Sequence, residues 1–216
     1  MSEVPLRYQL NEISQTRSHR EPSLAPMQPI SIRPLAEADA ETLVQAVRES
    51  YDEVSPWMVW CRPDYSLEHA LSWIGSTITG RESGTSYEFG AFDSQGTFVG
   101  VCGVNHINPI DRFANLGYWV RTSASRHGVA PAAVIAVAEW TFANTELNRL
   151  EIVAALGNHR SQRVAQKVGA RREGVLRQRL LVGGRPSDAV MFSLVRPLAA
   201  DQFTDRPEAG DISFYS

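Results

Sequence analysis

The spacing of hydrophobic residues changes along this chain, and these changes predict its secondary structure. Residues 30–33 and 87–92 alternate apolar and polar side chains, as a strand with one buried face does. Within 38–49 the apolar side chains recur every three or four positions, which predicts a helix. The same two patterns predict further strands over 97–104, 114–120, 150–155, 174–182 and 187–195, and further helices from Ser66 through Ile78, from about Gly128 to Trp140, and over 161–168.

Turn residues separate these elements and indicate how neighbouring strands connect. Residues 93–96, Asp-Ser-Gln-Gly, lie between two alternating segments and predict a hairpin. Gly183 and Gly184 predict a second hairpin, and Gly169 is typical of the residue that follows a helix. The resulting order, β-α-α-β-β-β-α-β-α-β-β, predicts a mixed α+β fold in which helices pack on a largely antiparallel sheet.

A single domain over residues 29–198 accommodates all of these elements. Residues 1–28 are polar, contain three prolines and show no sustained period, so we expect a flexible N-terminal arm. A start assigned too far upstream is the alternative, because Met27 directly precedes the first predicted strand. Residues 199–216 are expected to form a C-terminal tail.

Composition narrows the functional classes. The chain is 43% hydrophobic and 21% charged with a formal net charge of −3, which is typical of a soluble globular domain. This balance argues against nucleic acid as the main partner, although arginines concentrate between 160 and 185. No apolar run in the sequence is long enough to span a membrane. Cys61 and Cys102 are too few for a disulfide framework, which favours free thiols in a reducing cytoplasm.

Residues 125–133, Ser-Arg-His-Gly-Val-Ala-Pro-Ala-Ala, join a predicted strand to a predicted helix through a short glycine loop. The first backbone N–H groups of a helix have no intrahelical acceptor, and the helix dipole adds roughly half a positive charge there. A diphosphate fits such a helix end, and Gly128 and Ala130 leave room for its approach. An ordinary strand-to-helix turn is the simpler interpretation of this stretch taken alone.

Short motifs follow one another in a recognisable order between Ile30 and Leu198. They are Gly100-Val101, Asn105, Pro109 and Leu116 to Val120; Arg126 to Ala130; Asn158 with Ser161; Lys167 with Gly169; Arg172 to Arg177; and Gly184-Arg185 with Asp188. Together they resemble the GNAT acetyltransferase superfamily, most closely its RimJ/RimL-type branch, whose known members acetylate protein N-termini. Ser125 stands where Gln or Arg is usual, Ala170 replaces a usual aromatic residue, and Pro131 lacks an N–H that a phosphate could use.

The resemblance implies a six- to seven-stranded, mostly antiparallel sheet with helices on both faces. This sheet is expected to splay open between two parallel strands, 114–120 and 150–155, where the pantetheine arm of acetyl-CoA would lie. Acetyl-CoA is the implied cosubstrate, without a metal ion. Its implied contacts are the backbone of Trp119, Val120 and Arg121, the loop residues Arg126, His127, Gly128, Val129 and Ala130, and Asn158.

The implied reaction is attack of a neutral primary amine on a thioester carbonyl, which requires that the amine first lose a proton. Ser161 is the implied hydrogen-bond donor to the departing thiolate, although serine at a helix start is commonly an N-cap. We predict Glu88 as the base. His106, Asp111 and Glu173 are the alternatives, and water with good positioning could replace a base altogether.

Trp57, Trp60 and Asn105 are expected on the acceptor side. An aromatic-rich loop could shape a pocket for a peptide N-terminus or a small-molecule amine, or it could simply cover the core. The sequence leaves both acceptor classes open, together with a homodimer. A non-catalytic acyl-CoA-binding module of the same fold is the alternative function, favoured by Ser125 and by the lack of an evident base.

Overall fold

The computed structural model describes residues 29–197, so the arm predicted for 1–28 and the tail predicted for 199–216 lie outside the described residues. Within 29–197, no helix is both long enough and apolar enough to cross a membrane. Two short 3-10 helices occur, η1 (Glu37–Asp39) and η2 (Thr122–Ala124). The other elements are β1 (Ser31–Arg33), α1 (Ala40–Glu49), α2 (Tyr51–Val54), α3 (Leu67–Glu82), β2 (Tyr87–Phe92), β3 (Phe98–Asn108), β4 (Phe113–Val120), α4 (Val129–Asn144), β5 (Arg149–Ala155), α5 (His159–Lys167), β6 (Arg171–Val182) and β7 (Arg185–Val195).

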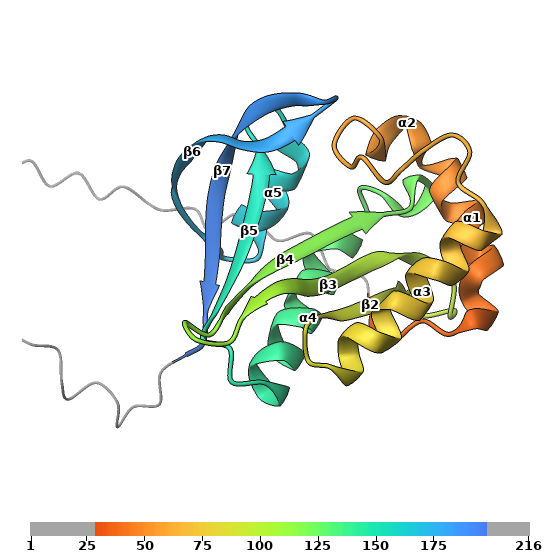
Figure 1. The fold of residues 1–216 in the computed structure, drawn as a ribbon, viewed down its shortest axis with the longest axis horizontal. Helices are drawn as coiled ribbons and strands as arrows, with labels where there is room; N and C mark the ends of the chain where they lie inside the picture. Colours follow the sequence, from red (N-terminus) through yellow and green to blue (C-terminus); the bar gives the residue numbers. More distant parts are fainter. Residues whose placement is uncertain (1–28, 198–216) are drawn as a thin grey trace, which may run out of the picture.

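The seven strands of the described region form one sheet in the order β1-β2-β3-β4-β5-β7-β6. Neighbouring strands run antiparallel except β4 and β5, which pair in parallel. Helices α1 and α3 cover one face of the sheet, α4 covers the other, and α5 lies beside β5 (Figure 1). The predicted mixed α+β fold with a mostly antiparallel sheet is confirmed.

Several element boundaries differ from those predicted, and each difference has a local cause. Strand β3 continues four residues beyond 104, because a register shift between Asn105 and Asn108 lets Asn108 pair with Phe113. Helix α5 begins at His159, two residues before the predicted start, because Asn158 caps it. The predicted loop after α1 contains the short helix α2, whose Val54 is buried.

A β-bulge shifts the phase in which strand β3 directs its side chains to the two hydrophobic cores. Phe98 and Val101 belong to the cluster that contains α1 and α3, whereas Val99 and Cys102 belong to the cluster that contains α4. Side chains of a regular strand alternate with a period of two, so this pattern requires one extra residue. The register against β2 indeed shifts beside Ala91.

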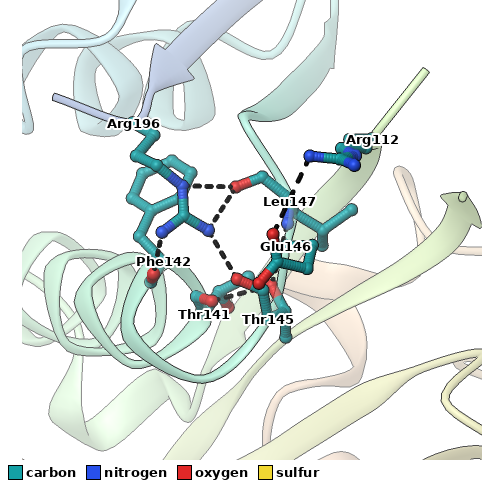
Figure 2. Close-up of polar contacts among 7 residues, drawn as sticks. All are labelled: Arg112, Thr141, Phe142, Thr145, Glu146, Leu147 and Arg196. Atoms are coloured by element: carbon teal, nitrogen blue, oxygen red, sulfur yellow. Dashed lines mark hydrogen bonds and ion pairs between the residues drawn. The ribbon is translucent and has the colours of Figure 1, made fainter. Parts of the chain in front are cut away.

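Arg196, just after β7, ties the end of α4 to the start of β5. Its guanidinium donates hydrogen bonds to the carbonyl oxygens of Phe142 and Thr145 at 2.5 Å each, and to that of Leu147 at 2.8 Å (Figure 2). The last carbonyls of a helix have no intrahelical donor, and a cation there also opposes the negative end of the helix dipole. Arg196 therefore holds together the end of the sheet at which β4 and β5 are still paired.

Candidate active site

Strands β4 and β5 separate after a short paired segment. They pair only from Phe113 to Asn115 and from Arg149 to Glu151. Beyond these residues β4 continues to Val120 and β5 to Ala155 without a ladder between them in the described structure, and the two strands diverge in Figure 1. The splayed sheet that the resemblance implied is therefore present.

A cavity of about 550 Å³, which we call the first cavity, lies between the end of β4, the loop into α4, the first turn of α4 and α5. Trp57 and Met58, from the loop after α2, also line it. Every residue predicted to contact acetyl-CoA lines this cavity except Arg121 and His127. The two segments that the motifs identified separately, Arg126 to Ala130 and Asn158 with Ser161, are thus brought to one site.

Helix α4 begins at the first cavity with its first amides uncapped. Gly128 is the N-cap residue, with a φ of 78°, and no side chain caps the helix. Glycine adopts this left-handed conformation without strain. The N–H groups of Val129 and Ala130 have no intrahelical acceptor, whereas Pro131 has no N–H. The departure at Pro131 therefore removes one donor and leaves the preceding two.

Basic side chains surround this helix end. Arg126, Arg163 and Lys167 line the first cavity, and the dipole of the 16-residue helix α4 adds partial positive charge. Arg160 lines it as well, and its guanidinium pairs with Glu53, the one carboxylate among the described lining residues. The first cavity is therefore suited to an anion such as a diphosphate.

Backbone direction along β4 distinguishes two neighbouring predicted contacts. The N–H of Arg121 donates to the carbonyl of Val99 at 2.9 Å and so points toward β3. Successive strand residues direct their backbone groups to opposite edges, so those of Val120 face β5 and the first cavity. The Arg121 side chain is bound by Glu49 at 2.6 Å. Val120, rather than Arg121, is placed to pair with an amide-containing ligand.

A second cavity, of about 290 Å³, lies among β3, β4, β5 and β6. Its polar lining side chains are mainly His106, Asn115, Glu151 and Arg179. The rest of the lining is largely apolar, including Phe113, Leu116, Ile152 and Leu180. An apolar pocket with a few convergent polar groups is typical of a ligand site.

Tyr118, Ser161 and Met58 line both cavities and mark the place where the two meet. The Tyr118 hydroxyl lies 2.9 Å from Ser161 Oγ and donates to the Ser161 carbonyl at 3.0 Å. Burial raises the pKa of Tyr118, so this hydroxyl stays protonated at neutral pH. Two hydroxyl groups therefore stand where a ligand in one cavity would meet a ligand in the other.

Ser161 is not the N-cap of α5, although its position in the sequence allowed that role. Asn158 is the N-cap of α5, and its side-chain oxygen accepts the N–H of Ser161 at 3.1 Å. The Ser161 hydroxyl contacts Tyr118 instead. Asn158 lines the first cavity, as predicted for a cofactor contact, with one acceptor already used by the helix.

Glu88, the predicted base, is not among the described residues that line either cavity. Its carboxylate accepts a hydrogen bond from Asn105 at 3.0 Å, and Asn105 accepts one from Asn115 at 2.9 Å. Burial raises the pKa of Glu88, while the Asn105 hydrogen bond and the charge of Arg81 oppose that rise. Asn115 is the member of this chain that reaches the second cavity, so Glu88 stands two side chains behind it.

Trp57 and Trp60, predicted on the acceptor side, have different surroundings. Trp57 lines the first cavity. The Trp60 ring lies 5.7 Å from that of Trp119 and 6.2 Å from that of Tyr65, measured between centroids. Trp60 therefore packs against two core rings while remaining 39% exposed itself, and neither tryptophan is among the described residues that line the second cavity.

The three alternative bases, Glu173, Asp111 and His106, have different surroundings in the structure. Both terminal nitrogens of Arg149 donate to the Glu173 carboxylate, at 2.7 and 2.5 Å, and lower the pKa of Glu173 to about 2, far below that of an effective base at neutral pH. Asp111 accepts a hydrogen bond from Asn108 at an exposed turn. His106, with a φ of 50°, is the alternative that lines the second cavity.

The lining residues that were not identified as site residues from the sequence include Met58, Tyr118 and Arg179. Tyr118 directly precedes Trp119 and Val120, which were predicted as cofactor contacts. Alternation along the strand places Tyr118 on the opposite face from Trp119. Met58 depends on the path of a loop, and Arg179 depends on a bulge in β6 that no glycine or proline announces. The path of the loop and the bulge in β6 have no short-range signature.

The sequence motifs led us to expect the architecture of an acetyltransferase. The structure has that architecture: the sheet splays between two parallel strands, beside a helix start that no side chain caps. Residues 30–171 match the Acetyltransferase (GNAT) domain family, and the chain belongs to this family. The family inferred from the motifs is thereby confirmed, and proteins named as RimL-type or ribosomal-protein acetyltransferases are among its relatives.

A Bacillus subtilis (strain 168) protein named "Putative ribosomal N-acetyltransferase YdaF" is 27% identical over 180 residues, which cover 77% of this chain and 91% of that protein. The solved structure of RimL, a ribosomal L7/L12 alpha-N-protein acetyltransferase in complex with coenzyme A, has a TM-score of 0.72 at 22% identity, covering 77% of this chain and 93% of its own. The microcin C7 self-immunity acetyltransferase MccE, solved with acetyl-CoA and AMP, also has a TM-score of 0.72, at 20% identity, covering 77% and 92%.

Proposed function

We propose that this acetyltransferase moves the acetyl group of acetyl-CoA directly to a primary amine in a ternary complex, the amine being a protein N-terminus or a small-molecule amine. The observation that carries the proposal is the junction of the two cavities at Tyr118 and Ser161. One cavity suits a long anionic ligand and the other a smaller, largely apolar one. A thioester that reaches the junction would lie within reach of an acceptor in the second cavity.

Acetyl-CoA would occupy the first cavity. Its diphosphate would accept hydrogen bonds from the N–H groups of Val129 and Ala130, with Arg126 supplying charge. The backbone of Val120 would pair with an amide of the pantetheine arm. Thr122 Oγ1, in the same lining, is buried and has no hydrogen-bond partner among the described residues, so polar ligand atoms could satisfy it.

In the transfer step, the lone pair of the amine nitrogen forms a bond to the thioester carbonyl carbon, and the bond from that carbon to sulfur breaks. The departing thiolate receives a hydrogen bond or a proton from the Ser161 hydroxyl, which contacts the Tyr118 hydroxyl, and a proton given up by Ser161 is replaced from water. The proton lost by the amine passes to His106 or to water in the second cavity. In this proposal Glu88 acts on the acceptor side through Asn105 and Asn115 rather than by direct contact.

A thiol-release assay tests the proposal. The full-length protein is incubated with acetyl-CoA and a panel of N-terminal peptides, polyamines and aminoglycosides, and free CoA thiol is measured over time. Calorimetry with acetyl-CoA alone provides the matched binding measurement. We expect saturable binding together with acceptor-dependent release. Binding without release on any acceptor would favour the non-catalytic acyl-CoA-binding module, and absence of binding would contradict both functions.

A further inference from the structure

Arg179 has an unusual position in the second cavity. It lines the cavity together with Leu180, although successive residues of a regular strand face opposite sides. The cause is a bulge in β6. Leu176 pairs with Ala189 and Leu180 pairs with Ser187, so three residues of β6 lie opposite one residue of β7.

A specific hydrogen bond holds this bulge. The N–H of Gln178 donates to Oδ1 of Asp188, the residue opposite, at 2.9 Å, and Gln178 has a φ of 48°. A positive φ is uncommon for a residue other than glycine and persists where the surroundings impose it. Bulges of this kind redirect side chains beside binding sites, and here the redirected side chain is Arg179.

The charge of Arg179 is not neutralised by its neighbours. It takes part in none of the ion pairs within residues 29–197. Glu151, the one carboxylate among the described residues that line the second cavity, already accepts a hydrogen bond from Nε of Arg149 at 2.8 Å. The second cavity therefore offers an unpaired guanidinium and no unpaired carboxylate from the described region.

We infer that the second cavity selects acceptors that carry a carboxylate close to the reacting amine, such as a peptide N-terminus followed by Asp or Glu, and that Arg179 binds this carboxylate. The inference rests on the proposed function, in which this cavity receives the acceptor. A guanidinium matches a carboxylate through two parallel hydrogen bonds. A polyamine or an aminoglycoside would instead bring a second cation against Arg179, and like charges in contact are unfavourable.

The test uses three peptides that differ only at the second position, Ser-Asp, Ser-Asn and Ser-Lys, at saturating acetyl-CoA. Their kcat/KM values are compared for the wild-type protein, Arg179→Gln and Arg179→Glu. Arg172→Gln is the matched control, because Arg172 is an exposed arginine of the same strand that is outside the described lining of both cavities. Binding of the same peptides to the protein saturated with CoA, which has no acetyl group to transfer, is measured in parallel.

We expect the wild-type protein and Arg172→Gln to prefer Ser-Asp over Ser-Asn by about threefold to fivefold, as for a solvent-exposed charge pair. Arg179→Gln should reduce this preference to less than about twofold, and Arg179→Glu should reverse it toward Ser-Lys. If none of the three peptides is acetylated but binding follows the same order, acetyl transfer to a peptide N-terminus fails as the proposed function and the inference about carboxylate binding stands. Equal use and equal binding of the three peptides, undetectable peptide binding, or an unchanged preference in Arg179→Gln would overturn the inference.

Discussion

Replacing Ser161 by alanine should slow acetyl transfer while leaving the fold nearly intact. The Tyr118 hydroxyl would keep its hydrogen bond to the Ser161 carbonyl at 3.0 Å, and Asn158 would still cap α5 through the backbone of residue 161. Only one hydrogen bond is lost, so the free energy of unfolding should fall by about 1 kcal/mol or less.

The kinetic effect should be much larger than the effect on stability. General acid groups contribute about 10²- to 10⁴-fold to a rate, and the nearby Tyr118 hydroxyl can replace part of the lost donor. We therefore expect kcat for Ser161→Ala to fall about 100-fold, which corresponds to about 2.7 kcal/mol of transition-state stabilisation. KM for acetyl-CoA should change by less than about threefold, because the phosphate contacts are elsewhere.

The assay is thiol release at varied acetyl-CoA, with the best acceptor held at saturation. Ser161→Thr is the matched variant, since it keeps a hydroxyl group and should retain most of the activity. A kcat for Ser161→Ala within about threefold of the wild-type value would refute the role of Ser161 as donor. A loss confined to KM would place its contribution in binding rather than in the chemical step.

Three further predictions concern the helix end, the fold and the pH dependence of stability. Gly128→Val should raise the Kd for acetyl-CoA at least about tenfold, because a side chain in the left-handed conformation costs about 1–2 kcal/mol and displaces the loop; Gly96→Val, at a turn glycine with the same φ of 78°, should leave the Kd unchanged in calorimetry. Arg196→Ala should lower the free energy of unfolding in urea by about 2–3 kcal/mol, because several carbonyls lose a charged donor, and a loss below about 0.5 kcal/mol would contradict that role. The pKa of Glu173 is lowered from 4.5 to about 2 by the hydrogen bonds of Arg149, so its contribution is fully present above pH 4.5 and is lost as the pH falls toward 2. Because this pair is partly exposed, Glu173→Gln should remove about 1 kcal/mol or less of that pH-dependent stability, and identical unfolding curves over this pH range would refute the assignment.

Local patterns in the sequence predicted the elements well where burial is regular. The alternating burial along the first part of β4 and the helical spacing in α1 reflect side chains packed on one face, and such periods are visible without any knowledge of the fold. The boundaries failed where polar side chains decide them. The Asn158 cap and the register shift after Asn105 depend on hydrogen bonds that no hydrophobic period records.

The residues of the candidate site also fall into those that the sequence predicted and those that it could not predict. The helix start at Gly128 and the serine at 161 belong to short motifs, and the structure brings them to one cavity. The acceptor side depends on residues remote in sequence, so His106 could only be offered as one base among several. Glu88 is a suitable base by residue type. The structure separates it from the second cavity, because Asn105 and Asn115 lie between them.

A crystal structure of the protein with bound coenzyme A tests the central claim most directly. We expect the diphosphate to accept hydrogen bonds from the N–H groups of Val129 and Ala130, and the sulfur to lie beside Ser161 where the two cavities meet. Coenzyme A bound away from the start of α4, or bound there with its sulfur directed away from Tyr118 and Ser161, would contradict the claim.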